Sequence, residues 1–252
     1  MALKRDFTRY LNFIFDDIVP PFLRDNKYFM WPFFYSLFGS KTRHFMEFKK
    51  IAPHLSGEQF RDYYVLLADK HLQRKTDLNG KTIEYILNGI SGDTVLDIAC
   101  GRGYIVGMLA EKFPGKTIYG IDIVSPQMEG KPDNLVIGSG NVEKIDYPDG
   151  FFDTVICAHT LEHVQDIGKA IGELRRVCRK KLIIVVPMQR EYKYTFDLHL
   201  HFFPYPESLK RALKNPEAEC RVIDGDIVYA ETAGNFPGRA KQQSANSEPV
   251  SG

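Results

Sequence analysis

The pattern of apolar positions changes twice along the chain. In the first 90 residues the apolar side chains recur at helical spacing, as in residues 8–18, 45–51 and 60–72. Between residues 93 and 187, short continuous apolar runs alternate with amphipathic stretches. The runs predict strands at residues 94–98, 117–123, 134–137, 152–157 and 181–186, and the stretches predict helices at 104–112 and 161–179. Strands that are apolar throughout are typical of a parallel sheet covered by helices on both faces.

Turn and cap residues divide the chain further. Ser56 and Gln59 form a capping box before a helix, and Asp224-Gly225 predicts a hairpin turn within residues 219–229. From Thr232 onward the chain is rich in Gly, Pro, Ser, Asn and Gln and has no apolar period. We therefore expect a helical extension over residues 1–90, an α/β domain over 91–231 and a disordered tail over 232–252.

Composition singles out the amino-terminal region. The 252 residues carry 33 Lys and Arg against 32 Asp and Glu, and this balance argues against a nucleic-acid partner. Of the 32 aromatic residues, 17 lie within the first 64 positions. One interpretation is a helical cap that packs on the sheet domain, with Tyr63, Tyr64 and Arg74 at a cofactor entrance. The other is a surface patch over residues 28–38, flanked by Lys27 and Lys41, that contacts a membrane or forms a homodimer.

Cysteines and the amino terminus favour a reducing, cytoplasmic location. Cys100, Cys157, Cys178 and Cys220 contain no CxxC pair, so neither a zinc site nor a redox motif is indicated. The first residues lack the apolar core of a secretory signal. The apolar run at 28–38 is far shorter than the roughly 20 residues of a membrane-spanning helix.

The segment at residues 95–103 carries the strongest chemical signal. A strand leads through Gly101 and Gly103 into a helix, whose free N–H groups can face an anionic group. Asp122 ends the next strand, where an acid can accept hydrogen bonds from both ribose hydroxyls. The segment therefore predicts an adenosine-containing ligand. Asp97 would repel a pyrophosphate and attract an ammonium group, which disfavours the alternative of an NAD-dependent oxidoreductase.

These residues resemble the class I S-adenosylmethionine-dependent methyltransferases. Asp97-x-Ala99-x-Gly101-x-Gly103 is similar to the first family motif, with Ala99 in place of the usual first glycine. Residues 140–143 resemble the segment that contacts adenine, and residues 153–164 resemble the fourth-strand motif, whose Leu-Glu-His-Val portion is typical of the small-molecule branch. The resemblance covers residues 91–231. It implies a Rossmann-like, seven-stranded, mostly parallel sheet with an antiparallel last strand.

The resemblance also implies roles for single residues. The cofactor would be S-adenosylmethionine, leaving S-adenosylhomocysteine as product. Its predicted ligands are Asp97, Ala99, Gly101 and Gly103 at the amino-acid end, Asp122 at the ribose, and Ile123, Asn141 and Val142 at the adenine. His159 would lie beside the methyl group as a base or acceptor orienter, and His163 follows one turn later. For each histidine the alternative is a structural role, with the ring bonded to the backbone.

The loop after the fifth predicted strand is rich in side chains that end in a polar group. Tyr192, Tyr194, Asp197, His199 and His201 are the predicted substrate-binding residues for a small-molecule or carbohydrate acceptor. The last three alternate, so they would share one face of an extended chain and could ligate a metal. We favour an acceptor-binding lid and assign no metal.

Several functions stay open at this point. Methyl transfer from a sulfonium is an in-line displacement in which alignment supplies most of the acceleration. A hydroxyl acceptor is favoured because His159 would give it a base. The residues after the fourth strand lack the Asn/Asp-Pro-Pro-aromatic signature that holds a base amino group, which again disfavours a nucleic acid. N- or C-methylation and a catalytically silent, cofactor-binding regulatory subunit are the alternatives.

Overall fold

The chain divides into two compact units. A computed structural model describes residues 13–68 and 75–237; Arg74 and residues 238–252 of the expected tail lie outside them. The helical unit holds the chain up to Asp77 together with Glu162–Gln165 and Met188–Pro204. The sheet unit holds Leu78–Leu161, Asp166–Pro187 and the chain from Tyr205 on.

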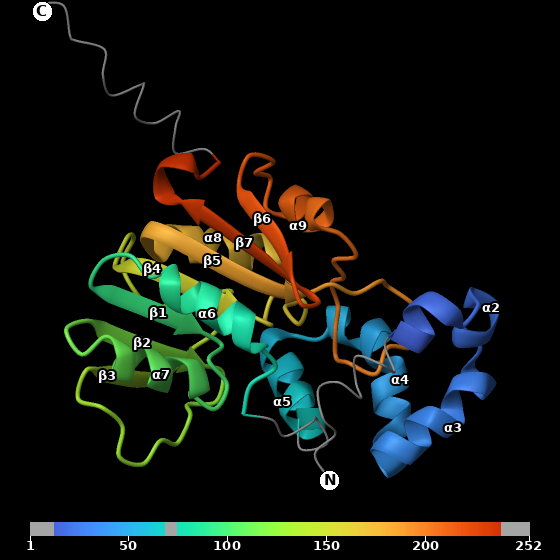
Figure 1. Cartoon of the computed structure of the whole chain (residues 1–252). Coiled ribbons are helices and arrows are strands. Elements are labelled where there is room, and N and C mark those ends of the chain that lie inside the picture. The colour runs from blue at the N-terminus through green and yellow to red at the C-terminus, as the bar shows by residue number, and fades with distance from the viewer. Residues whose placement is uncertain (1–12, 69–74, 238–252) are drawn as a thin grey trace, which may run out of the picture. The chain divides into compact units, whose positions relative to one another are not determined.

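The sheet unit is built on seven strands in the order β3-β2-β1-β4-β5-β7-β6 (Figure 1). They are β1 (Thr94–Ile98), β2 (Thr117–Asp122), β3 (Leu135–Ser139), β4 (Phe152–Ala158), β5 (Cys178–Pro187), β6 (Glu219–Ile223) and β7 (Asp226–Thr232). Strands β1 to β5 pair in parallel, and β7 is antiparallel to both of its neighbours. The predicted Rossmann-like, mostly parallel sheet with an antiparallel last strand is confirmed.

The register brings three strand ends to one edge of the sheet. Asp97 of β1 pairs with Gly120 of β2, and Ile98 of β1 pairs with Cys157 of β4. Because parallel strands end on the same side, the loops that follow β1, β2 and β4 meet at that edge. This is the edge at which open α/β sheets bind their ligands.

Both faces of the sheet are buried. Ile156 and Ile183 belong to an apolar cluster that also contains residues of α6 (Gly80–Asn88) and α7 (Tyr104–Lys112). Figure 1 shows α6 lying along the near face of the sheet. The alternate side chains Val155 and Leu182 are fully buried as well, but they point to the opposite face. This pattern explains why the strands are apolar throughout rather than alternating.

Helix α8 (Ile167–Val177) is shorter than predicted. We expected a helix over residues 161–179, but the helix begins after Asp166, whose Oδ1 accepts a hydrogen bond from the Lys169 N–H at 2.9 Å. Residues 162–165 belong instead to the helical unit. Helix α9 (Pro206–Ala212) also belongs to the sheet unit and has a proline at its first position, where a backbone N–H is not needed.

The helical unit has an aromatic core. Its elements are η1 (Ile14–Ile18), α2 (Pro21–Arg24), α3 (Lys27–Phe38), η2 (Gly39–Lys41), α4 (Thr42–Ile51), η3 (Ala52–His54) and α5 (Gly57–Ala68). Phe34 stacks on Phe196 with ring centroids 4.7 Å apart, and Phe38 stacks on Phe45. Many of the early aromatic residues therefore pack against the Met188–Pro204 segment, which is distant in sequence. The capping box before α5 is confirmed, since the Ser56 and Gln59 side chains each accept a hydrogen bond from the other's N–H.

The predicted boundary at residue 90 is wrong. Helix α6 belongs to the sheet unit, because Ile86 is fully buried in the sheet cluster. At its start, Asn79 and Thr82 donate hydrogen bonds to Asp226 of β7. The division between the units falls after Asp77.

The carboxyl-terminal hairpin forms as predicted, but the expected tail begins too early. Asp224 and Gly225 have φ of 48° and 88°, the two left-handed residues of a tight hairpin turn. Order then continues through η4 (Ala233–Asn235) to Phe236, which is 2% exposed and lies under the Arg175 guanidinium. Burial of this ring holds the chain on the sheet unit beyond residue 232.

Within residues 13–68 and 75–237, none of the helices combines the length and apolar character that crossing a membrane requires.

Candidate functional site

The turn after β1 depends on left-handed backbone conformations. Gly101 and Gly103 have φ of 57° and 80°, and Ala99 has φ of 61°. A Cβ on Gly103 would lie 2.4 Å from Met128 Sδ, so the turn packs closely as well as bending sharply. Ala99 adopts the left-handed conformation despite its side chain, which stores strain in the turn.

Asp122 closes this turn from the neighbouring strand. Its Oδ2 accepts a hydrogen bond from the Gly101 N–H at 2.8 Å, and its Oδ1 accepts one from the Val124 N–H at 3.3 Å. Burial raises the pKa of Asp122, although these backbone hydrogen bonds oppose the rise. The carboxylate is thus fixed at the strand end by the turn that it closes.

Asp97 lies deeper in the same cluster. Its side chain is buried at the end of β1, and this burial, together with the nearby Asp122, raises its pKa to about 8. A buried carboxyl with a raised pKa favours a ligand that brings a positive charge. The Cys100 thiol, also affected mainly by burial, has a raised pKa and is no candidate nucleophile.

The loop after β3 lies beside this cluster. The Gly140 N–H donates to the Asp122 carbonyl at 2.8 Å, and the Asn141 Oδ1 accepts a hydrogen bond from the Glu143 N–H at 2.9 Å. Val142 is buried and Ile123 is half-buried. The structure therefore brings the predicted adenine-contacting residues to the same sheet edge as Asp97 and Asp122.

His159 follows β4 with a left-handed backbone. Its φ is 51°, and its N–H donates to the Val185 carbonyl at 2.8 Å. The ring Nε2 lies 3.3 Å from Asp226 Oδ1. Strain at a polar residue on the binding edge is typical of a functional position.

Sequence reasoning missed Asp226, which completes this arrangement. It is 2% exposed, and its Oδ2 accepts hydrogen bonds from Asn79 Nδ2 at 2.8 Å and from Thr82 Oγ1 at 3.1 Å. One signal was available, because an acid placed directly after the hairpin turn precedes the apolar run Ile227–Ala230 of the same strand. A buried carboxylate in that position needs a partner.

The remaining predicted site residues lie in the helical unit. They are His163, Tyr192, Tyr194, Asp197, His199 and His201. His163 Nδ1 lies 2.8 Å from the Leu198 carbonyl, and His201 Nε2 lies 2.9 Å from the Val164 carbonyl. Tyr192 is buried in the aromatic core.

The structure does not group Asp197, His199 and His201 as a set of metal ligands. Residues 190–201 form bends and irregular backbone rather than a strand, and the His201 ring contacts the Val164 carbonyl, whereas Asp197 and His199 both contact Gln189. Asp197 Oδ2 faces Gln189 Nε2 at 3.4 Å, and His199 Nδ1 faces the Gln189 Oε1 at 2.6 Å. His199 groups instead with Glu162 and His163.

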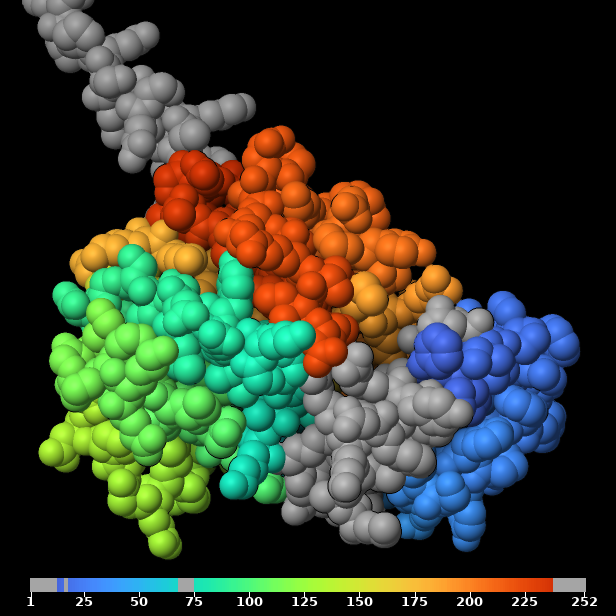
Figure 2. All heavy atoms as spheres, in the orientation of Figure 1, coloured from blue at the N-terminus to red at the C-terminus, as the bar shows by residue number. Residues whose placement is uncertain are grey.

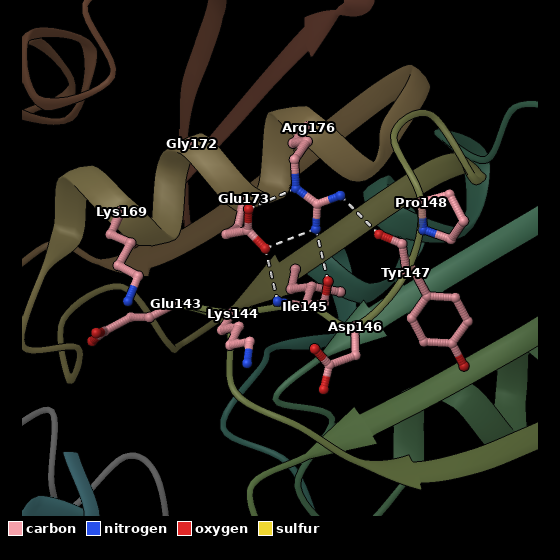
Figure 3. Close-up of a pocket in the computed structure, with 10 residues that line it drawn as sticks. All are labelled: Glu143, Lys144, Ile145, Asp146, Tyr147, Pro148, Lys169, Gly172, Glu173 and Arg176. Carbon is pink, nitrogen blue, oxygen red and sulfur yellow. Dashed lines mark hydrogen bonds and ion pairs between the residues drawn. The ribbon is translucent and has the colours of Figure 1, made fainter.

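A groove of about 770 Å³ lies on α8 of the sheet unit (Figure 3). Its centre is the Arg176 guanidinium, which bonds Glu173 and the carbonyls of Ile145 and Tyr147. Glu173 also accepts a hydrogen bond from the Ile145 N–H at 2.8 Å. These contacts fasten the loop before β4 onto α8, so we assign the groove a structural role.

Comparison with known proteins is consistent with the sheet-edge geometry. A family described as "Methyltransferase domain" matches residues 96–186. The chain is 34% identical to a probable methyltransferase, ltbC, of Aspergillus luteorubrus, over 47% of this chain and 45% of that protein. It is 31% identical to a ubiquinone biosynthesis O-methyltransferase of Rhodopseudomonas palustris, over 48% of each chain.

These matches are partial. The chain spans less than half the length of either of these curated relatives. Among solved structures it is similar to a SAM-dependent methyltransferase from Aquifex aeolicus, with 20% identity, a TM-score of 0.48, and coverage of 61% of this chain and 88% of that one.

Proposed function

We propose that the chain is a class I S-adenosylmethionine-dependent methyltransferase that methylates a small molecule; the match of residues 96–186 to a family described as "Methyltransferase domain" supports this. The reaction is an in-line transfer of the sulfonium methyl group to an acceptor atom. The main support for the cofactor is the cluster of Asp97, Asp122 and the Gly101–Gly103 turn at one sheet edge. In this proposal Asp97 faces the ammonium group, Asp122 binds the ribose hydroxyls, and Ile123, Asn141 and Val142 surround the adenine.

The acceptor atom is a hydroxyl oxygen in this proposal. The observation that carries it is the contact between His159 Nε2 and Asp226 Oδ1 at 3.3 Å. With the Asp226 carboxylate beside Nε2, Nδ1 is the ring atom that would take a proton from the acceptor, and the nearby negative charge would stabilise the imidazolium that forms. Asp226 itself is held by Asn79 and Thr82, so it acts as a positioning residue. A proton acceptor of this kind matters more for a hydroxyl, which is a weak nucleophile until it loses its proton, than for a neutral amine, which is nucleophilic without deprotonation.

Turnover of two variants tests this assignment. We expect His159→Ala to lower kcat by about 10²-fold or more, the usual contribution of a general base, with S-adenosylhomocysteine affinity retained. Asp226→Asn should shift the pH dependence of kcat and lower its plateau. Unchanged turnover in His159→Ala would remove the histidine from the mechanism and favour an N- or C-acceptor.

The relatives indicate the chemical class of the acceptor but not which molecule it is. Proteins to which the chain is similar include a demethylmenaquinone methyltransferase, a ubiquinone biosynthesis O-methyltransferase and an ajmaline N-methyltransferase. All three names describe small organic acceptors, and we propose the same class here. The acceptor contacts Tyr194, Asp197 and His201 stay predictions from the sequence. Methyl transfer to any such acceptor would exclude a silent regulatory subunit.

We also propose that the amino-terminal helices contact a membrane surface. The most exposed apolar side chains of this region are Phe13, Ile18, Phe22, Tyr28 and Tyr35, which are between 52% and 87% exposed. Helices α2 and α3 are blue in Figure 2, and their atoms form part of the surface that is visible in that view. Lys27 lies over the Trp31 ring, an arrangement that suits an interface between apolar and charged layers.

Flotation with anionic vesicles tests the membrane contact. We expect the full chain to float with the vesicles and Phe22→Ser/Tyr28→Ser to stay in solution. Protein that stays unbound while eluting as a dimer would replace the membrane by a second copy of the chain.

A further inference from the structure

Three potential metal ligands come together inside the helical unit. They are Glu162, His163 and His199, and one ligand atom of each lies within 4.8 Å of the others. All three belong to the same compact unit, and Glu162 and His199 are buried. We propose that these residues bind a divalent transition-metal ion such as Zn²⁺.

Hydrogen bonds orient both imidazoles for this role. His163 Nδ1 lies 2.8 Å from the Leu198 carbonyl, and His199 Nδ1 lies 2.6 Å from the Gln189 Oε1. Both partners are acceptors, so each Nδ1 donates a hydrogen bond, and in a neutral imidazole of this tautomer Nε2 is the atom that can ligate a metal. The Gln189 amide is oriented by its other end, because Nε2 faces the Asp197 carboxylate. This second layer of hydrogen bonds is typical of metal-binding histidines.

The backbone fixes the two chain segments that carry the ligands. The Glu162 carbonyl accepts hydrogen bonds from the Leu200 N–H at 2.6 Å and the His201 N–H at 3.1 Å. These bonds join the segment of Glu162 and His163 to the segment of His199. The site is therefore held by backbone geometry and needs no large rearrangement.

The ligand set of the cluster also suits a transition-metal cation. The Glu162 side chain is 1% exposed, and its Oε1 lies 4.0 Å from His163 Nε2. Two histidines and one glutamate form a known three-ligand set for Zn²⁺ with an open fourth position.

The distances fit a metal after a small contraction. Zinc lies about 2.0–2.2 Å from such ligands, so tetrahedral ligand atoms are about 3.4 Å apart. The 4.8 Å limit and the 4.0 Å separation of Glu162 from His163 require side-chain shifts on the order of 1 Å. Tyr64 meets His163 edge-on with centroids 5.8 Å apart, and Phe202 lies against His199, so aromatic rings wall the cluster.

Zn²⁺ titration of the chelator-treated full chain tests the proposal without requiring turnover. We expect one Zn²⁺ per chain with Kd below about 1 µM for the wild type, and at least a hundredfold weaker binding for His199→Ala and Glu162→Gln. His201→Ala is the matched control, because that ring bonds the Val164 carbonyl and lies outside the cluster. Near-ultraviolet circular dichroism confirms that each variant is folded.

Two results would overturn the site. One is a wild-type chain that binds no Zn²⁺ at micromolar concentration, which would assign the cluster to an imidazolium of His163 paired with Glu162. The other is unchanged Zn²⁺ affinity in the folded His199→Ala and Glu162→Gln variants. Both outcomes are independent of the proposed methyl transfer, because the readout is metal bound per chain rather than product formed.

Discussion

Asp97 illustrates how a single residue can serve binding at the expense of stability. Its folded-state pKa of about 8 lies far above the ordinary value of 3.8, because burial and then Asp122 penalise the charged form. The unbound folded state therefore binds a proton that the unfolded chain has already released at neutral pH. The contribution of Asp97 to the free energy of unfolding is therefore most favourable at low pH, and it is lost as the pH rises from about 4 to about 8.

Asp97→Asn should expose this trade-off. Without ligand, we expect the variant to unfold several degrees above the wild type at pH 8 and at nearly the same temperature at pH 4.5. Its affinity for S-adenosylhomocysteine should fall, because the ammonium group loses its carboxylate. Thermal unfolding at the two pH values measures the first effect, with the exposed Asp133→Asn as control. An equal difference at both pH values would contradict a raised pKa.

At this scale the sequence located residues better than it located their partners. Asp97 and Asp122 were predicted from the glycine turn, and both lie at the predicted sheet edge. Asp226 was missed because its importance arises from His159, which is 67 positions away and meets it only through the β4-β5-β7 order. The grouping of His199 with Glu162 and His163 was not predicted, because an irregular loop, unlike a strand, has no regular repeat that shows which side chains lie together.

At the element scale, Asp153 anchors the amino-terminal end of β4. One oxygen accepts hydrogen bonds from the Asp93 and Thr94 N–H groups, and the other faces Arg179 at 2.7 Å and Lys180 at 3.1 Å. Burial alone would raise the pKa of Asp153, but the hydrogen bonds from Asp93, Arg179 and Lys180 outweigh it and lower that pKa. This carboxylate lies at the opposite end of the strand from His159, so its role is structural.

Replacing Asp153 should weaken the sheet while sparing the site. Asp153→Asn is expected to lower the free energy of unfolding by about 3 kcal/mol at pH 7, since a buried, multiply bonded carboxylate loses its charge. The control is Asp149→Asn, an exposed partner of Arg176, for which we expect less than about 1 kcal/mol. Urea denaturation provides both values. If both variants lost a similar amount of unfolding free energy, Asp153 would contribute no more to stability than an exposed carboxylate does.

The parallel strands were the most predictable elements. Each of the five apolar runs became a strand of the parallel part, because burial on both faces leaves a continuous apolar signal. The start of α8 was misplaced because residues 161–165 are apolar or helix-compatible, yet tertiary contacts draw Glu162–Gln165 into the helical unit. Gln165, for example, donates to the Ala52 and Leu55 carbonyls.

On the scale of the whole molecule, the helical unit is discontinuous in sequence. The amino-terminal helices supply most of its core, and Phe196 and Leu198 from the Met188–Pro204 segment complete it. Local patterns indicated a helical extension, but they contain no sign that a loop between β5 and α9 completes its core. This unit holds the proposed acceptor contacts, the proposed metal ligands and the exposed aromatic surface, whereas the proposed cofactor contacts belong to the sheet unit.

Calorimetric titration of the full chain with S-adenosylhomocysteine, and separately with NAD, tests the central claim most directly. We predict one binding site for S-adenosylhomocysteine, no heat from NAD, at least about tenfold weaker binding in Asp122→Ala, and unchanged binding in Asp133→Ala. Binding of NAD in place of S-adenosylhomocysteine, or an affinity for S-adenosylhomocysteine that Asp122→Ala leaves unchanged, would contradict the assignment of this sheet edge.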